Sequence, residues 1–338
     1  MKHAILAIAL AAAIAAASGA RAADPIQLKL GFPAPPMSFV NTRGVAPWIK
    51  DVEAAAEGAI EIKLFPGGTL GNFRNIYDRT IAGVSDISFG TPGSEGQTFA
   101  KTGVSSLPFE SEHSTEASLA LWRLFEKKII ADEFDKVKPL ALFTFSSSGM
   151  HSTKLIKSAD DMKGLKLAAG GKTAADALLV LGASPVTMTP AETYQSISRG
   201  LVDGANMSWP GVQVFKLFEV AKFHLSVPFG LAAGYIIMNK ESYARLPAKA
   251  KQAIDRYSYE AFTRRMGTGA DAEDEAILAR LKKMPGQTFN ALSAEEKARW
   301  RRILAPVTDA WMRTTPDGPR VLATFRAEIA AALKAKSM

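Results

Sequence analysis

The sequence predicts an α/β protein built from two lobes. Strand-like and helix-like segments alternate through most of the 338 residues, which is typical of layered α/β folds. A single hydrophobic core seldom grows beyond about 250–300 residues, so a chain of this length favours two cores. A segment of the first half also has a counterpart in the second half, as two similarly built lobes would require.

The N-terminal segment, residues 1–22, has the features of a secretory signal peptide. It contains a charged start at Lys2, an apolar run of about a dozen residues, and small residues at Ala20 and Ala22. We expect cleavage before Ala23 and export of a soluble chain, because the apolar run is too short for a comfortable membrane span; a retained anchor is the alternative. Removing this segment lowers the formal charge from +8 to +6. The remaining basic residues are mixed with acidic ones, so we expect no nucleic-acid partner.

The next segments predict a β–α–β unit. Ile26–Leu30 and Ile60–Leu64 alternate apolar and polar residues, as half-buried strands do. Between them, apolar residues recur at helical spacing from Trp48 to Ala55, and Gly58 ends the predicted helix. Further short strands are predicted at Ala141–Phe145 and Leu165–Leu167.

One local pattern occurs twice. Tyr77 precedes Gly83 by six residues, and Tyr194 precedes Gly200 by six residues. We expect each copy to form a helix ended by glycine, a tight turn, and a strand at 87–89 or 204–207. The second helix has an explicit start, because Thr189-Pro-Ala-Glu192 is a capping box with proline at the first helical position.

Residues 160–186 predict a strand, a glycine loop, a helix, a turn and another strand. This arrangement usually holds a ligand at the loop, whose only cation is Lys172. Beyond Asn239 the pattern is helical. The segment from about Pro247 to Met284 predicts one long helix, bent where Gly267 and Gly269 interrupt it. A further helix is predicted to start at Ser293, by a capping box, and the C-terminus from Pro306 is predicted to be helical again.

The sequence contains no motif that favours catalysis. There is no cysteine, and the histidines beyond the signal peptide, His113, His151 and His224, do not stand at metal-ligand spacing. Ser146-Ser-Ser-Gly149 lacks the leading glycine of a nucleophile elbow. A dinucleotide-binding loop comes directly after a strand, but no predicted strand precedes the glycines of 267–272. We therefore expect no enzyme, no metal and no cofactor, and keep a secreted α/β hydrolase as the alternative.

Aromatic and polar residues follow several of the predicted strands. Ligands of open α/β sheets bind outside the carboxyl ends of strands, so these residues are candidates for a pocket between the lobes. Trp209 is the strongest aromatic candidate, because it follows a strand in a turn that contains proline, whereas His151 can equally be a structural hydrogen-bonding residue. The candidates are Phe32, Pro33, Phe39, Phe89 and Thr91 in the first lobe, and Ser148, His151, Lys172, Asn206, Met207 and Trp209 in the second.

A series of short motifs along the whole mature chain resembles a known family. Each motif is weak alone, but their order and spacing are specific. They are Leu64-Phe-Pro-Gly-Gly-Thr-Leu-Gly71, Leu107-Pro-Phe109, Asp161-Met-Lys-Gly-Leu-Lys-Leu167, Leu181-Gly-Ala-Ser-Pro-Val186, Gly200-Leu-Val-Asp-Gly204, the segment 215–224, and Met238-Asn239. In these motifs the sequence resembles the DctP-type substrate-binding proteins of TRAP transporters.

The resemblance implies a fold, a location and a partner. It implies a periplasmic receptor with two α/β lobes, joined by crossing strands and a long connecting helix, that closes over one small ligand. The ligand would then pass to a TRAP-type membrane permease. A receptor that reports to a membrane sensor would share this fold and stays open as an alternative. In most members the ligand is an organic acid, whose carboxylate is held by an arginine just after the Gly-Leu-Lys-hydrophobic strand.

This sequence departs from the family at that arginine. Gly164-Leu-Lys-Leu167 is followed by Ala168, and a methyl group cannot pair with a carboxylate. Three readings remain open. In the first, Lys172 replaces the arginine, helped by the amides at the start of the next helix. In the second, another cation, Arg43 or Lys101, reaches in from the opposite lobe. In the third, the ligand is neutral or largely apolar and is held by Trp209, Phe32 and Phe89.

The expected division of the chain follows from the two lobes and their crossovers. After the signal peptide, we expect the first lobe to contain 23–147 and about 231–265, and the second lobe to contain 148–230 and about 266–305. Residues 306–338 are expected to form a C-terminal helical segment that packs on the lobes.

Overall fold

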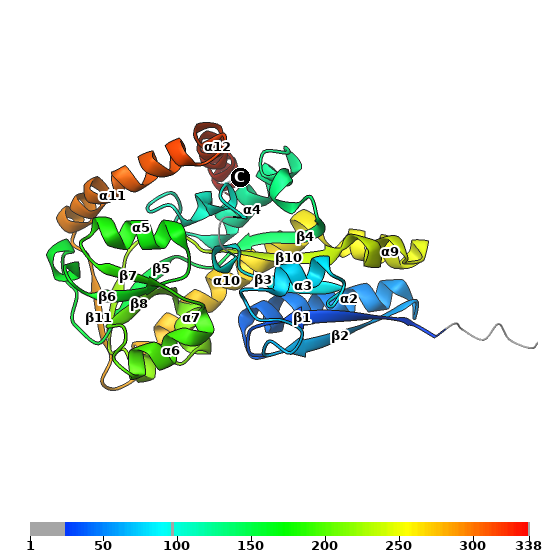
Figure 1. Cartoon of the computed structure of the whole chain (residues 1–338), viewed down its shortest axis with the longest axis horizontal. Coiled ribbons are helices and arrows are strands. Elements are labelled where there is room, and N and C mark those ends of the chain that lie inside the picture. The colour runs from blue at the N-terminus through cyan, green and yellow to red at the C-terminus, as the bar shows by residue number, and fades with distance from the viewer. Residues whose placement is uncertain (1–23, 96–97, 337–338) are drawn as a thin grey trace, which may run out of the picture.

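Figure 1 shows two α/β lobes side by side, with helices running across both. The computed structural model describes residues 24–95 and 98–336, and the predicted signal peptide lies outside these residues. Within this part of the chain the strands form two sheets, one of five and one of six strands. The predicted two-lobed α/β fold is confirmed.

The first lobe is built on the sheet with strand order β2-β1-β3-β10-β4. β1 is parallel to β2 and β3, whereas the late strand β10 lies between β3 and β4 and is antiparallel to both. The strands are β1 (Ile26–Phe32), β2 (Ile60–Pro66), β3 (Ile87–Gly90), β4 (Val137–Thr144) and β10 (Ala233–Asn239). The helices are α2 (Ala46–Ala56), α3 (Ile76–Ile81), α4 (Ser114–Glu126), α8 (Lys240–Ala244) and α9 (Ala248–Tyr257).

The second lobe is built on the sheet with strand order β11-β9-β5-β8-β6-β7. β5 is antiparallel to β8 and β9, while β6 is parallel to β7 and β8. The strands are β5 (Ser148–Ser152), β6 (Lys166–Ala169), β7 (Ser184–Thr187), β8 (Gly204–Ser208), β9 (Phe223–Ser226) and β11 (Thr288–Ala291). The helices are α5 (Lys172–Val180), α6 (Pro190–Ser198) and α7 (Trp209–Val214).

Two long helices pack on both lobes. α10 (Tyr259–Leu281) places Phe262 and Met266 in the core of the first lobe and Ile277 and Leu281 in the core of the second. α11 (Ala294–Thr314) begins against the second lobe and delivers Trp311 to the core of the first. α12 (Gly318–Lys336) then packs on α4. The chain also crosses between the sheets after β4 and again before β10.

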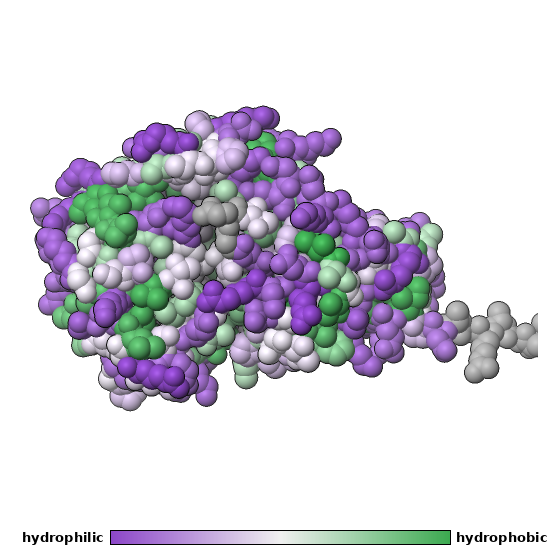
Figure 2. Space-filling model, viewed as in Figure 1, coloured by the Kyte–Doolittle hydropathy of each residue, from purple (hydrophilic) through white to green (hydrophobic). Residues whose placement is uncertain are grey.

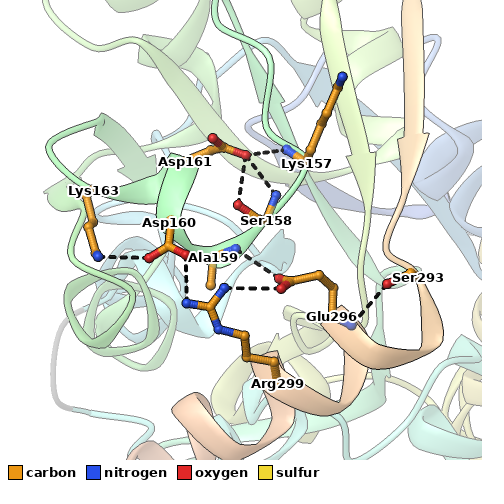
Figure 3. A network of polar contacts seen from close by, with 9 residues as sticks. All are labelled: Lys157, Ser158, Ala159, Asp160, Asp161, Lys163, Ser293, Glu296 and Arg299. Atoms are coloured by element: carbon orange, nitrogen blue, oxygen red, sulfur yellow. Dashed lines mark hydrogen bonds and ion pairs between the residues drawn. The ribbon is translucent and has the colours of Figure 1, made fainter.

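The start of α11 is fastened to the second lobe by a polar network, drawn in Figure 3. Arg299 donates to Asp160 at 2.7 Å and to Glu296 at 3.1 Å, and Glu296 accepts from the backbone amide of Ala159 at 3.2 Å. Ser293 caps the helix by accepting from the amide of Glu296 at 3.1 Å. The network joins the turn before β6 to α11, so this end of the helix moves with the second lobe.

Both copies of the repeated pattern have the predicted structure. α3 is followed by Gly83 at a φ of 71° and then by β3, and α6 is followed by Gly200 at a φ of 68° and then by β8. The positive φ is the reason that glycine ends both helices. The capping box at Thr189 and Glu192 is present as predicted.

The long helix predicted from about 247 to 284 is wrong in one respect. The segment forms two helices, α9 and α10, because Ser258 has extended backbone and Tyr259 a φ of 66°. Gly267 lies inside α10, where a Cβ atom would come within 2.9 Å of the Thr115 backbone, so it permits close packing on α4. The C-terminus from Pro306 is helical as predicted, with this proline inside α11 and α12 following it.

Polar residues cover most of the face shown in Figure 2, where apolar side chains form separate patches. Short turns connect the helices and strands. The turns are a π-helical turn, Val40–Val45, and 3-10 turns at Pro92–Ser94, Thr102–Ser106, Ala131–Phe134, Ala159–Met162 and Leu217–Glu219. Among the described residues, no helix has the length and apolar character that a membrane span needs.

Candidate ligand site

A cavity of about 320 Å³ lies between the two lobes. Its wall is formed by the ends of β3, β5, β6 and β8, by the loops that follow them, and by α11. Of the predicted site residues, eight line this cavity. They are Phe39, Phe89 and Thr91 from the first lobe, and Ser148, Ala168, Lys172, Asn206 and Met207 from the second.

Eight aromatic residues line the cavity. Phe89 at the end of β3 is in the centre of a ring cluster, with centroids 5.9 Å from Phe73 and 6.4 Å from Phe145. Phe145 is half-buried, directly follows β4, and makes an edge-to-face contact with Phe39 at 5.8 Å. The aromatic residues of the wall are Phe39, Phe73, Phe89, Phe99, Phe145, Phe215, Phe229 and Trp311. Such a surface binds a flat apolar group by burial and ring packing.

Uncharged polar groups interrupt the aromatic wall. Hydroxyl groups come from Ser38, Thr91 and Ser94 in the first lobe and from Ser148 in the second. The loop between β6 and α5 contributes Gly170 and Gly171, and Gly171 at the start of α5 offers no side-chain cap. The first amides of α5 therefore lack a side-chain acceptor, and helix N-termini attract anions.

Lys172 is the one cationic side chain that lines the cavity within residues 24–95 and 98–336. Its Nζ lies 2.5 Å from a carboxylate oxygen of Asp176, one turn further along α5, and Asp176 lines the cavity as well. The two side chains are 62% and 45% exposed, so their ion pair is weak and easily exchanged for another partner. The other predicted cations are engaged elsewhere, Arg43 with Glu273 at 2.7 Å and Lys101 with Asp132 at 2.8 Å.

Ala168 lies on β6 between Ala205 of β8 and Val186 of β7. It is 3% exposed and packs within the core of the second lobe, although it contributes to the cavity wall. Among the described residues no arginine lines the cavity, so nothing replaces the guanidinium that the family resemblance places here.

Four predicted site residues do not line the cavity. Phe32 is fully buried in the core of the first lobe, where its ring lies 5.0 Å from that of Phe89, and Pro33 is buried beside it. Trp209 is the first residue of α7, and its ring is buried in the core of the second lobe, 4.7 Å from the ring of His151. His151 is itself fully buried. These four side chains pack in the core next to the wall residues. The packing at each strand end decides which side chain faces the cavity and which faces the core.

Several wall residues are not among those predicted from the sequence. Phe145 is the last residue of the predicted strand 141–145, which is a signal that could have identified it. Phe99, Phe229 and Trp311 follow no predicted strand, and Trp311 comes from a helix more than 60 residues beyond the nearest part of the wall in the sequence. Only the tertiary packing of α11 across both lobes brings it to the site.

The lobes touch at the rim of the cavity. A Cβ atom on Gly93 would lie only 2.5 Å from the carbonyl oxygen of Gly170, so these glycines let the two backbones meet. Arg74 of the first lobe also pairs with Glu192 of α6 at 2.8 Å. The structure therefore has the lobes closed over the cavity.

Two partly buried carboxyl groups lie close to this closed cleft. Burial raises the pKa of Glu95, next to the wall residue Ser94, to about 7, and Glu95 accepts a hydrogen bond from the Tyr235 hydroxyl at 2.5 Å. Burial also raises the pKa of Asp274 on α10 to about 6. Asp274 accepts from the Ser146 hydroxyl and from the Trp209 amide, so it connects α10 to the crossover and to α7. No cluster of metal-ligating side chains occurs among the described residues.

Comparison with known proteins gives a consistent result. The DctP profile, described as "Bacterial extracellular solute-binding protein, family 7", matches residues 34–315. The chain is 27% identical over 331 residues to the "Outer membrane transporter protein TsaT" of Comamonas testosteroni, covering 95% of this chain and 97% of that protein. It is 25% identical over 295 residues to the "C4-dicarboxylate-binding periplasmic protein DctP" of Rhodobacter capsulatus, covering 85% of this chain and 86% of that one.

Solved structures are similar over nearly the whole chain. A TRAP solute-binding protein from Rhodoferax ferrireducens T118, in complex with copurified benzoate, has a TM-score of 0.88 at 30% identity, covering 92% of this chain and 99% of that one. A marine metagenome protein specific for aromatic acid ligands, in complex with 3-hydroxybenzoate, has a TM-score of 0.87 at 26% identity, covering 91% and 98%. A Bordetella bronchiseptica protein with bound (R)- and (S)-mandelate has a TM-score of 0.84 at 27% identity, covering 91% and 100%.

Proposed function

Since this chain belongs to the DctP family of bacterial extracellular solute-binding proteins, family 7, we propose that it is a receptor whose ligand is a small aromatic carboxylate. The protein is an extracytoplasmic solute receptor of the TRAP type. The aromatic wall between the lobes is the observation that carries the choice of ligand. The benzoate, 3-hydroxybenzoate and mandelate complexes of similar proteins support it.

The carboxylate of such a ligand would be held without an arginine. Lys172 can leave Asp176 at little cost, because an exposed i,i+4 ion pair contributes only about 0.3–0.5 kcal/mol. The hydroxyls of Ser38, Thr91 and Ser148 and the first amides of α5 would supply neutral hydrogen bonds. A carboxylate also favours the N-terminal end of that helix. Lys172 would thus act as a mobile cation, whereas an arginine would hold the carboxylate by two parallel hydrogen bonds.

The aromatic ring would lie against phenylalanines of both lobes. Phe39, Phe89 and Phe145 pack in or against the core of the first lobe, and Phe229 belongs to the core of the second, so the ring would bridge the two lobes that move on closure. Binding energy would then be gained only in the closed arrangement. A ligand with that preference shifts the protein from open to closed.

The wider role follows from the family. We infer that the closed receptor delivers its ligand to a TRAP-type permease, that it works in the periplasm after cleavage before Ala23, and that it catalyses no reaction. Serines line the cavity, but among the described residues no histidine lines it beside them. Steady turnover of an ester or amide panel would refute the inference of a non-catalytic receptor. We also infer the lobe boundaries given by the sequence, at about 147, 230, 265 and 305.

The ligand is tested by calorimetry on the mature chain. Benzoate, its neutral analogue benzamide and the aliphatic succinate separate charge from aromaticity. We expect benzoate to bind, benzamide to bind more weakly, and succinate to bind least. Tight binding of benzamide would show that the cavity selects a neutral aromatic ligand, and a preference for succinate would refute the aromatic proposal.

The role of Lys172 has a matched control. Lys172→Met keeps the apolar stem and removes the charge, and it should weaken benzoate about tenfold or more while leaving benzamide unchanged. Lys166→Met removes the same charge from β6, where Lys166 is exposed and does not line the cavity, and should change neither ligand. Unchanged benzoate affinity in Lys172→Met would remove this lysine from the site.

A further inference from the structure

Two histidines form a buried pair behind the wall of the cavity. His151 of β5 and His224 of β9 are directly opposite each other in the antiparallel register, and they are 0% and 1% exposed. Their Nδ1 atoms lie 2.9 Å apart. The outer nitrogens also have partners: His151 Nε2 lies 2.9 Å from the carbonyl oxygen of Met207, and His224 Nε2 lies 2.9 Å from Oε1 of Gln287.

The partners fix where the protons must be. A carbonyl oxygen can only accept, so His151 Nε2 must carry a proton. The amide of Gln287 is oriented by a second bond, in which its Nε2 donates to the carbonyl oxygen of Phe218 at 3.0 Å. Its Oε1 therefore faces His224, whose Nε2 must carry a proton as well. Each neutral imidazole has only one ring proton. Two neutral rings would thus face each other with two bare Nδ1 lone pairs.

From this hydrogen-bond pattern we propose that His151 and His224 share a third proton between their Nδ1 atoms, so that the pair holds one positive charge behind the cavity wall. The Nδ1 separation of 2.9 Å is a normal hydrogen-bond length, and it requires a proton on one of the two nitrogens. The charge belongs to the pair and not to either ring alone.

The surroundings of the pair suit a cation. The ring of Trp209 lies 4.7 Å from that of His151 and 5.5 Å from that of His224, and the ring of Phe289 lies 4.9 Å from that of His224. Aromatic rings within about 6 Å of a cation stabilise it, and more so where water is excluded. Two aromatic rings therefore flank the buried histidine pair.

Other charges near the pair are few, and burial opposes the proposal. Strands β5, β8, β9 and β11 and helix α7 contain no Asp, Glu, Lys or Arg. Burial lowers the pKa of His151 to about 3 and lowers the pKa of His224, and Lys222 just before β9 lowers the latter further. The hydrogen bond between the Nδ1 atoms favours the protonated pair, because this bond exists only with the third proton in place.

The charged groups of α10, which packs on α7, complete the surroundings. Glu275 and Arg280 are exposed. Asp271 and Glu273 are engaged with the first lobe, through the amides of α4 and through Arg43. Asp274 accepts from the backbone amide of Trp209 and is the carboxyl group on α10 that reaches this part of the second lobe.

The pair would influence the ligand site in two ways, and this step rests on the proposed function. The hydrogen bond from His151 holds the end of β8, where Asn206 and Met207 form part of the wall, so His151 is a positioning residue. The register also places His151 opposite Ala205, and Ala205 opposite Ala168. The charge therefore lies two strands from Ala168, roughly 10 Å away at the usual strand spacing. It would favour an anionic ligand where no arginine is present.

The protonation of the pair can be measured without any ligand. The mature chain, starting at Ala23, contains only His113, His151 and His224, so ¹⁵N-labelled histidine gives few ring signals; His113→Gln removes the exposed one. At pH 7 we expect three protonated ring positions across the two buried rings. Two protonated positions, or four, would overturn the proposal, whatever the protein binds.

A second measurement tests the effect on the ligand. His224→Gln can still donate to His151 Nδ1 through its amide but removes the charge. It should weaken benzoate about threefold to tenfold and leave benzamide unchanged, as expected for one charge at this distance in a partly screened interior. His113→Gln should change neither affinity. Equal benzoate binding in His224→Gln would overturn the effect on the ligand. If the wild type shows three protons but does not bind benzoate, the proposed function fails and the proton-sharing pair stands.

Discussion

The hydrogen bond between Ser146 and Asp274 offers a sharp test of how the crossover is held. Ser146 is 2% exposed and lies between β4 and β5, where the chain passes from the first lobe to the second. Its hydroxyl donates to Asp274, which also accepts from the amide of Trp209. Burial raises the pKa of Asp274 from 3.8 to about 6, and the Ser146 bond opposes that rise. Ser146→Ala should therefore destabilise the protein mainly when Asp274 is ionised.

The magnitude depends on pH. A hydrogen bond to a charged group contributes about 1.5–3 kcal/mol, and a neutral one about 1 kcal/mol. Ser146→Ala should thus lower the free energy of unfolding by about 2 kcal/mol at pH 8 and by about half as much at pH 5, where Asp274 is mostly protonated. In the wild type, the native state binds more protons than the unfolded state between about pH 4 and 6. Its stability therefore falls as the pH rises through that window, by about 3 kcal/mol for this group.

Urea unfolding at pH 5 and pH 8 measures both quantities. Ser147→Ala is the matched control, because the neighbouring hydroxyl is buried and has no hydrogen-bond partner among the described residues. Its removal should change the free energy of unfolding by no more than about 0.5 kcal/mol at either pH. An equal loss at both pH values in Ser146→Ala, or an equally large loss in Ser147→Ala, would refute the reasoning.

Three further changes test the closed cleft. Gly93→Ala places a methyl group 2.5 Å from the carbonyl oxygen of Gly170. It should weaken ligand binding by about 1–3 kcal/mol in calorimetry. Thermal unfolding of the free protein should stay unchanged. Glu95→Gln keeps an acceptor for Tyr235 but removes a carboxyl group whose pKa burial raises to about 7. The wild type should lose stability as the pH rises from about 4.5 to 7, and denaturation of Glu95→Gln should show that this loss is smaller by about 3 kcal/mol. Phe145→Ala should weaken benzoate by about 1–3 kcal/mol and Phe145→Leu by less, because leucine keeps apolar area without the ring; equal losses would show that ring packing contributes nothing.

The sequence predicted the local structure well where a single residue type decides it. Gly83 and Gly200 end their helices because the chain there needs a positive φ, and Thr189 starts α6 through a capping box, so these features could be predicted without a partner. The break between α9 and α10 could not, because nothing in the residues at Ser258 and Tyr259 signals it. Propensity alone favoured a continuous helix.

The candidate site was predictable in part. Phe89 ends one predicted strand and Lys172 follows another, and both residues line the cavity. Phe32 and Trp209 follow strands too, but the packing of each strand end turned their side chains into the core. Position along a strand predicts which end a residue occupies; it does not predict which way the last side chain points.

By itself, the sequence determined the α/β architecture, the glycine ends of α3 and α6 and the capped start of α6, since each follows from local residue chemistry and periodicity, and it shows directly that no arginine follows Leu167. Only the tertiary structure decided that Trp311 of α11 reaches the cavity and that Lys172 pairs with Asp176 there. It alone brought His151 within hydrogen-bond distance of His224, 73 residues further along the chain. The physical reason is that these contacts depend on strand register and helix packing between distant segments, and no local pattern in the chain encodes the distance between them.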